Sequence, residues 1–176
     1  MKGKKLLKKR PKKKIQREYR EYEELIDRLC RKMTNINDLI ENGVSKCGGT
    51  NKWEGISGFK HQIDVSLKNN QHVLLIECKY WKNRIRAEVI LSVLKRLEDI
   101  RNGPEANGRE CRIALVVSKG FQKGVKKLGE FYKKGISLFR VDKDGTIEII
   151  SHTHFLIVVP LSIKMQVQPT IITQGQ

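Results

Sequence analysis

Apolar side chains recur at the spacing of a helix over residues 17–33. Positions three or four apart share one face of a helix, so these side chains form a stripe that packs against a core. The members of the stripe are Tyr22, Ile26, Leu29 and Met33. At 100° per residue, Glu23 falls at the edge of the stripe and Glu24 on the opposite side. Glu23 is therefore the acid of this helix that can face a site, and an ordinary surface glutamate is the equal alternative.

The pattern then changes to that of two strands joined in a hairpin. Residues 62–67 alternate between apolar and polar, with three aliphatic side chains on one face. Residues 73–76 are an aliphatic run, which is typical of a strand buried on both faces. The polar stretch 68–71 between them contains two Asn residues, which tolerate the backbone angles of a tight turn.

The length of the hairpin loop decides which side chains share a face. A loop of two or four residues centred on 69–70 pairs Gln62 with Glu77. Asp64 then lies on the same face as Glu77 and diagonal to it, roughly 7–8 Å away at the backbone. An odd-length loop would reverse the parity and separate the two acids.

The rest of the chain alternates between strand and helix patterns. The expected elements are a strand over 53–59 broken by two glycines, a helix over 86–101, a strand over 112–118 parallel to its neighbour, a helix over 121–134 with Phe131 or Tyr132 in its apolar stripe, and strands over 136–141 and 146–150. Residues 34–52 are expected to be irregular. This order predicts an α/β protein, a three-layer α/β/α domain with a central mixed sheet.

Charge is concentrated at one end of the chain. The 176 residues carry a formal net charge of +17, from 36 Lys and Arg against 19 Asp and Glu. Residues 1–17 hold ten of the basic side chains and no acid. We therefore expect a disordered basic arm over 1–17, one domain over 18–160 and a weakly ordered tail over 161–176. This charge balance indicates a polyanionic partner, most simply DNA or RNA. A solubilising arm or a localisation signal is the alternative reading of the arm.

Several other classes of protein are disfavoured. The four Cys are widely spaced without a CxxC pair, which argues against a zinc site. Three of them fall in predicted buried positions, where a free Cys acts as a small hydrophobe. His152 and His154 have no supporting ligand cluster and receive no role. No stretch reaches the ~18–20 apolar residues that span a bilayer, and 1–17 has no apolar core of a secretory signal. We expect a cytoplasmic, reducing location without membrane contact.

The candidate chemistry lies where the aliphatic strand ends. Glu77 and Lys79 are two residues apart, so a carboxylate and an ammonium project from one face. With Asp64, they are the groups that metal-dependent phosphodiester hydrolysis needs. Carboxylates hold a hard cation such as Mg²⁺, and the lysine positions or deprotonates water or stabilises the developing charge. The alternative is a salt bridge where the strand leaves the sheet.

A basic stretch with an aromatic residue follows directly. Trp81, Lys82, Arg84 and Arg86 are suited to holding a phosphate backbone and stacking on a displaced base. The equal alternative is that Trp81 caps the core and that the charges are solvated.

The spacing of Asp64 and the Glu77-Cys78-Lys79 motif resembles the PD-(D/E)xK nuclease superfamily. The stretches 61–65 and 76–81 are most similar to its Mrr-like restriction endonuclease branch, and the resemblance covers roughly residues 20 to 140. Ile63 stands where the superfamily has proline, a position that varies widely.

The resemblance implies a restriction-endonuclease-like fold and a DNA endonuclease that uses Mg²⁺, with Mn²⁺ as a substitute. Asp64 and Glu77 would bind the metal, with the Cys78 carbonyl as a further ligand, and Lys79 would act on the water or the phosphate. The first helix of the family often supplies an acid after an aromatic, which Glu23 matches. Gln62, on the same predicted face, is a candidate for orienting water or metal.

Two other functions stay open at this point. A non-catalytic nucleic-acid-binding protein could keep the fold, although such a protein would be expected to lose an acid or the lysine. A junction-resolving nuclease would act as a homodimer on branched DNA. Double-stranded DNA is the expected substrate, and a homodimer is a possible assembly.

Overall fold

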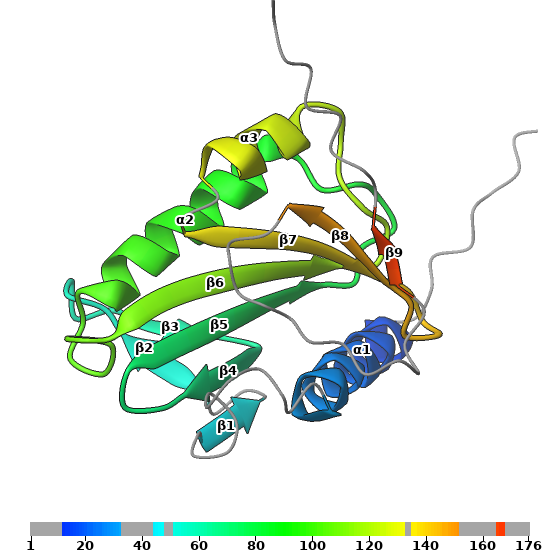
Figure 1. The fold of residues 1–176 in the computed structure, drawn as a ribbon. Coiled ribbons are helices and arrows are strands. Elements are labelled where there is room, and N and C mark those ends of the chain that lie inside the picture. The colour runs from blue at the N-terminus through cyan, green and yellow to red at the C-terminus, as the bar shows by residue number, and fades with distance from the viewer. Residues whose placement is uncertain (1–11, 33–43, 48–50, 133–134, 152–164, 168–176) are drawn as a thin grey trace, which may run out of the picture.

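The computed structural model describes residues 12–32, 44–47, 51–132, 135–151 and 165–167 (Figure 1). Its main sheet has seven strands in the order β1-β4-β5-β6-β7-β8-β9, and β2 and β3 form a separate pair. The strands are β1 (Val44–Cys47), β2 (Lys52–Glu54), β3 (Lys60–Gln62), β4 (Val65–Lys68), β5 (His72–Lys79), β6 (Glu110–Val117), β7 (Ile136–Val141), β8 (Ile147–Ser151) and β9 (Met165–Val167).

Helices cover both faces of the main sheet. The helix α1 (Lys12–Lys32) packs on one face, and α2 (Ala87–Arg101) and α3 (Val125–Phe131) pack on the other (Figure 1). The predicted three-layer α/β/α architecture is therefore confirmed. The strands β5, β6 and β7 are parallel to one another, because α2 and α3 lie in the crossovers between them. β4 pairs antiparallel with β5, and β8 pairs antiparallel with β7. Among the described residues, no helix is both long and apolar enough to cross a lipid bilayer.

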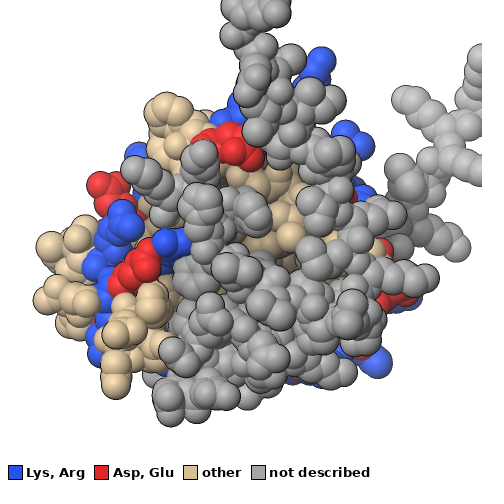
Figure 2. Space-filling view, in the orientation of Figure 1, with Lys and Arg blue, Asp and Glu red and all other residues tan. Residues whose placement is uncertain are grey.

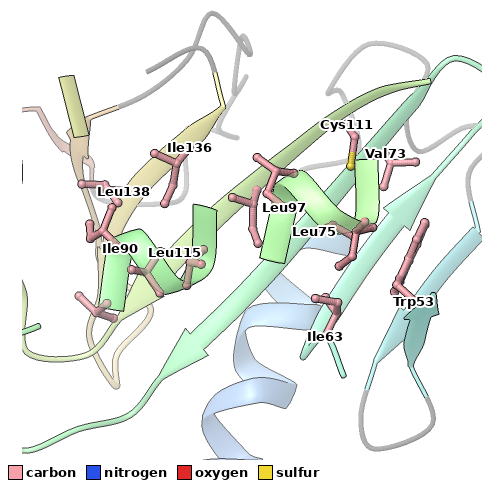
Figure 3. Close-up of a cluster of buried hydrophobic side chains, with 14 of the residues drawn as sticks. Trp53, Ile63, Val73, Leu75, Ile90, Leu97, Cys111, Leu115, Ile136 and Leu138 are labelled. Atoms are coloured by element: carbon pink, nitrogen blue, oxygen red, sulfur yellow. The ribbon is translucent and has the colours of Figure 1, made fainter. Parts of the chain in front are cut away.

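The central strand β5 is buried on both sides, as its aliphatic run predicts. Val73 and Leu75 join the core beneath α2 and α3, which also contains Leu97 and Leu115 (Figure 3). Ile76 and the thiol-bearing Cys78 belong to the second core beneath α1. Alternate residues thus feed two separate hydrophobic layers, as the period of a strand requires. Cys78 and Cys111 are both buried free thiols.

The predicted strand over 62–67 is wrong because the chain changes sheets within it. Gln62 ends β3, pairs with Lys52 and is exposed. The buried Asn51 holds the turn, since its backbone carbonyl accepts the N–H of Ile63 and its side-chain amide donates to the Ile63 carbonyl. The predicted pairing of Gln62 with Glu77 is therefore also wrong, and Gln62 does not share a ladder with the candidate site.

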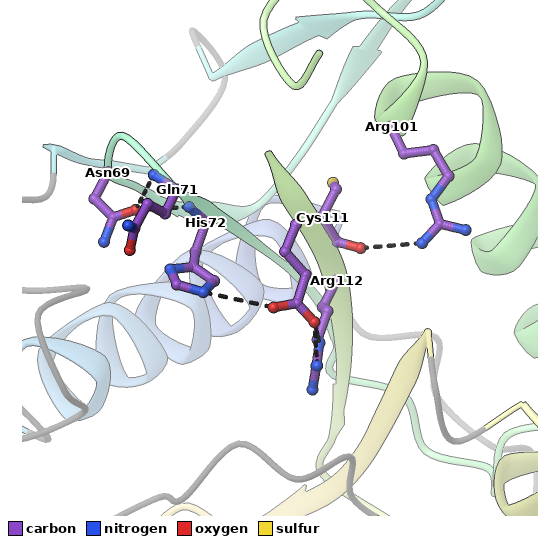
Figure 4. A network of polar contacts seen from close by, with 7 residues as sticks. Asn69, Gln71, His72, Arg101, Cys111 and Arg112 are labelled. Carbon is purple, nitrogen blue, oxygen red and sulfur yellow. Dashed lines mark hydrogen bonds and ion pairs between the residues drawn. The ribbon is translucent and has the colours of Figure 1, made fainter. Parts of the chain in front are cut away.

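The hairpin loop nevertheless has an even number of residues, as the predicted placing of Asp64 and Glu77 on one face requires. Lys68 pairs with Val73, and the Asn69 N–H donates to the His72 carbonyl, which leaves the two residues 70–71 at the tip. The Asn69 side-chain oxygen accepts the N–H groups of Gln71 and His72 (Figure 4). The register is displaced by two residues from the predicted one, so the parity of the two acids is retained.

Other elements agree with the prediction in part. The helix over 86–101, the strand over 136–141 and the parallel strand β6 are confirmed, whereas α3 is shorter than 121–134 and Phe131 is 79% exposed rather than in the core. The helix α1 starts at Lys12, so residues 12–17 are not part of a disordered arm. β1 lies within the region expected to be irregular, and β9 lies within the expected weak tail. His152 and His154 are outside the described residues.

An acid on α2 attaches the β2–β3 pair to the main body. Asp99 accepts hydrogen bonds from the backbone N–H (3.0 Å) and the hydroxyl (2.7 Å) of Ser57, and its Oδ2 lies 2.6 Å from His61 Nε2. A Cβ on Gly55 would lie 2.0 Å from Asp99 Oδ2, so only glycine allows this approach. The contacts of His61 and Ser57 lower the pKa of Asp99 to about 2.

We predict that Asp99→Asn lowers stability at pH 7 and that the deficit is smaller at pH 3. A depressed carboxyl pKa adds stability above the unfolded value of 3.8, and this stability is lost as pH falls toward 2. Urea unfolding at both pH values measures the deficit. The control is Glu98→Gln, the adjacent exposed acid, and an equal deficit at both pH values would contradict the role of the Asp99 charge.

Candidate active site

The candidate acids meet at the carboxyl end of β5. Val65 pairs with Ile76, and continuing this register by one residue sets Asp64 opposite Glu77. Both side chains are withdrawn from water, with Asp64 8% and Glu77 1% exposed. Buried carboxylates need compensating partners, so their contacts define the site.

Two cations from different elements cover the Glu77 carboxylate. Lys79 Nζ lies 3.0 Å from Oε2, and Arg96 of α2 donates from Nη1 to Oε1. Lys79 reaches Glu77 because both project from the same face of β5, as the two-residue spacing predicts. Arg96 lies on α2, nineteen residues after Glu77 in the chain, and no sequence pattern pointed to it.

Asp64 is held by the backbone of β5 and by the first helix. Its Oδ2 accepts the Cys78 N–H at 2.6 Å, and its carboxyl group forms a hydrogen bond with Glu23 of α1. Burial, followed by the nearby charge of Glu77, raises the pKa of Asp64. The first helix therefore brings Glu23 to the site, at the edge of the apolar stripe where its position predicted it.

Glu23 and Asp64 both have carboxyl pKa values above the ordinary range. Burial first, then the charge of Asp64 and their hydrogen bond, raise the pKa of Glu23 to about 7. Carboxylates this close cannot all ionise in a poorly hydrated site, so one retains its proton near neutral pH. The hydrogen bond between the two side chains raises the pKa of Glu23 and opposes the rise in the pKa of Asp64.

The Cys78 carbonyl already has a protein donor. The Tyr19 hydroxyl donates to it, and burial, followed by the charge of Asp64, raises the pKa of Tyr19 above its ordinary value. A carbonyl oxygen has two lone pairs, so it can accept more than one partner. Tyr19 is four residues before Glu23 on α1, and side chains at this spacing share a helix face. That spacing is the signal by which the sequence could have revealed it.

The residues after Lys79 lie on the surface. Trp81 is 44% exposed and therefore does not cap the core, and Lys82, Arg84 and Arg86 are exposed. The segment is anchored at Ile85, which is buried. On the face drawn in Figure 2, the described Lys and Arg side chains lie among Asp and Glu side chains.

The donor chemistry suits a hard divalent cation, although the site is not arranged around one. Within the described part of the chain, no group of three or more His, Cys, Asp or Glu is placed to hold a metal. Mg²⁺ is commonly bound by one or two carboxylates together with water and substrate phosphates, so two acids and a carbonyl are sufficient in kind. A cation would also relieve the mutual repulsion that raises the pKa of Asp64.

Comparison with known proteins supports the fold alone. No protein-family model and no curated protein matches the chain. The structure is similar to the crystal structure of AF1548, a protein of unknown function, with a TM-score of 0.52 and 15% sequence identity. The match covers 69% of this chain and 58% of that protein, so this chain spans little more than half of that protein's length.

We predict that Glu23→Gln stabilises the protein at pH 8 but not at pH 5. A raised carboxyl pKa adds stability below the unfolded value of 4.5, and this stability is lost as pH rises through about 7. Gln keeps a donor to Asp64 without a proton to lose. Thermal melting in EDTA measures the difference, with Glu24→Gln as the exposed control. A difference between Glu23→Gln and wild type that does not change with pH would contradict this assignment.

Proposed function

We propose that this protein is a metal-dependent DNA endonuclease of the Mrr-like restriction type, with a restriction-endonuclease-like fold. The observation that carries the proposal is the convergence of Asp64, Glu77 and Lys79 at the end of the central strand. Asp64 immediately precedes β4, Glu77 lies on β5, and Lys79 follows Glu77 by two residues, in the order that the sequence resemblance implies.

Asp64 and Glu77 would hold Mg²⁺ or Mn²⁺, and the sequence resemblance implies the Cys78 carbonyl as a further ligand. Such an ion lowers the pKa of bound water and neutralises charge that develops on phosphorus. The backbone N–H of Cys78 orients the Asp64 carboxylate toward β5. Glu23 changes the charge of the site near neutral pH, because its pKa is raised to about 7.

Lys79 is the residue we assign to the chemistry of the water or the scissile phosphate. Its side chain is 19% exposed, so it is shielded yet open on one side. The ion pair with Glu77 holds the Lys79 side chain in place, and a positioned ammonium stabilises a phosphorane-like charge. The exposed segment 81–86 begins two residues later, where it can hold the backbone of double-stranded DNA beside the reacting bond.

A non-catalytic nucleic-acid-binding protein is the second candidate. Glu77 is already neutralised by Lys79 and Arg96, as a purely structural ion pair would be. Metal-dependent cleavage distinguishes the two functions, because a binding protein would retain salt-sensitive DNA affinity without cutting.

We predict that the protein cuts plasmid DNA in Mg²⁺ or Mn²⁺ and not in EDTA. Asp64→Asn and Lys79→Ala should each reduce the rate by about 10²–10⁴, the range typical of a positioned catalytic side chain. Nicked and linear products are measured by gel electrophoresis, and linear product would be consistent with a homodimer that cuts both strands. A branched substrate tests junction resolution.

The control for this experiment is Asp144→Asn, which makes the same chemical change in an exposed turn. Both site variants should still bind DNA in EDTA. Absence of cutting on every substrate, together with retained binding, would favour the binding protein over the nuclease.

We predict that Lys82→Ala/Arg84→Ala weakens DNA binding without sequence preference. The slope of log affinity against log salt should fall by about 0.9 for each phosphate contact that is lost. Fluorescence anisotropy on a short duplex at several salt concentrations measures the slope. The control is Lys52→Ala/Lys60→Ala on the β2–β3 pair, which removes the same charge. An unchanged slope in the Lys82/Arg84 variant would exclude this segment from the interface.

A further inference from the structure

We infer that Arg96 is a positioning residue that occupies Glu77 until a divalent cation displaces it, and that it then contacts the phosphate to be cleaved. This inference rests on the proposed function. It assigns a role to a residue on α2 that the sequence resemblance does not include.

Both oxygens of the Glu77 carboxylate are occupied in the structure. Lys79 takes Oε2 and Arg96 takes Oε1, while the carboxylate itself is almost fully buried. A cation that binds through Glu77 therefore approaches a carboxylate on which each oxygen already holds one positively charged partner. Either partner also repels an incoming cation by its positive charge.

Arg96 is the partner that can leave. Lys79 is tied to Glu77 by the geometry of one strand, since the two residues are neighbours on the same face of β5. Arg96 belongs to a separate helix, and its side chain is 31% exposed against 19% for Lys79. Its long side chain can thus turn toward solvent while α2 stays in place.

The displaced guanidinium would lie beside the phosphate that the cation binds. Arginine stays protonated at all accessible pH values and matches a phosphate with two parallel hydrogen bonds. The same residue then has two opposite effects, because it weakens cation binding in the free protein and strengthens the hold on the substrate during cleavage. A purely structural ion pair would not produce this combination.

The test compares Arg96→Gln with wild type in two measurements on the full chain. Calorimetric titration with Mn²⁺ should show about tenfold tighter binding, as expected when a positive charge close to the ligand carboxylate is removed. The rate of plasmid cleavage at saturating Mn²⁺ should fall by about a hundredfold, the scale of losing one stabilising donor. Arg96→Lys should recover part of the rate.

Lys95→Gln is the matched control, because Lys95 is the preceding, exposed residue on α2 and loses the same charge. It should change neither the Mn²⁺ affinity nor the rate. Mn²⁺ binding by Arg96→Gln that is no tighter than by wild type would overturn the role of Arg96 while leaving the nuclease proposal intact. Absence of Mn²⁺ binding in wild type and Arg96→Gln alike would overturn both.

A measurement on wild type covers the case in which Arg96→Gln does not fold. The Nε–Hε resonance of Arg96, identified by its loss in Arg96→Lys, should shift when Mg²⁺ is added to the ¹⁵N-labelled protein. Asp64→Asn, which lacks one metal-binding carboxylate, should need more Mg²⁺ for the same shift. An Arg96 resonance that does not move while the backbone amide of Glu77 does would overturn the inference.

Discussion

The burial of the Glu77 carboxylate is the constraint on which the arrangement of the site depends. A charge placed at the end of a central strand and almost fully removed from water costs several kcal/mol unless cations accompany it. Lys79 and Arg96 supply these cations from the same strand and from α2. Burial, followed by the nearby charge of Glu77, raises the pKa of Asp64, and burial, followed by the charge of Asp64, raises the pKa of Glu23.

The sheet makes this concentration of charge possible. β5 pairs with β4 on one side and β6 on the other, and its alternate residues fill two hydrophobic layers. The strand is therefore rigid up to the point where its charged end begins. The tight loop at the far end of the β4–β5 hairpin fixes the register, because Asn69 satisfies three backbone hydrogen-bonding groups there and leaves little freedom to slip.

Much of the fold was predictable because its elements have strong local patterns. The helix over 86–101 and the strand over 136–141 have clear periodicity and clear breakers, and both were predicted to within a residue. The prediction of one strand over 62–67 was wrong because the alternation of apolar and polar residues there is equally compatible with one strand or with two short ones. The hydrogen bonds of Asn51 to Ile63 decide for two pieces, and they join residues twelve apart in the chain. For this reason Gln62 does not belong to the candidate site.

The sequence by itself determined that Glu77 and Lys79 share a face and that Glu23 lies at the edge of a helix stripe, whereas the placing of Asp64 depended on the length of the hairpin loop. These are consequences of the periods of strands and helices, which act over a few residues. Only the tertiary structure decided that Arg96 covers Glu77 and that Tyr19 covers the Cys78 carbonyl. Helical spacing places Tyr19 on the same face as Glu23, but both contacts arise between elements whose approach depends on how the two cores pack.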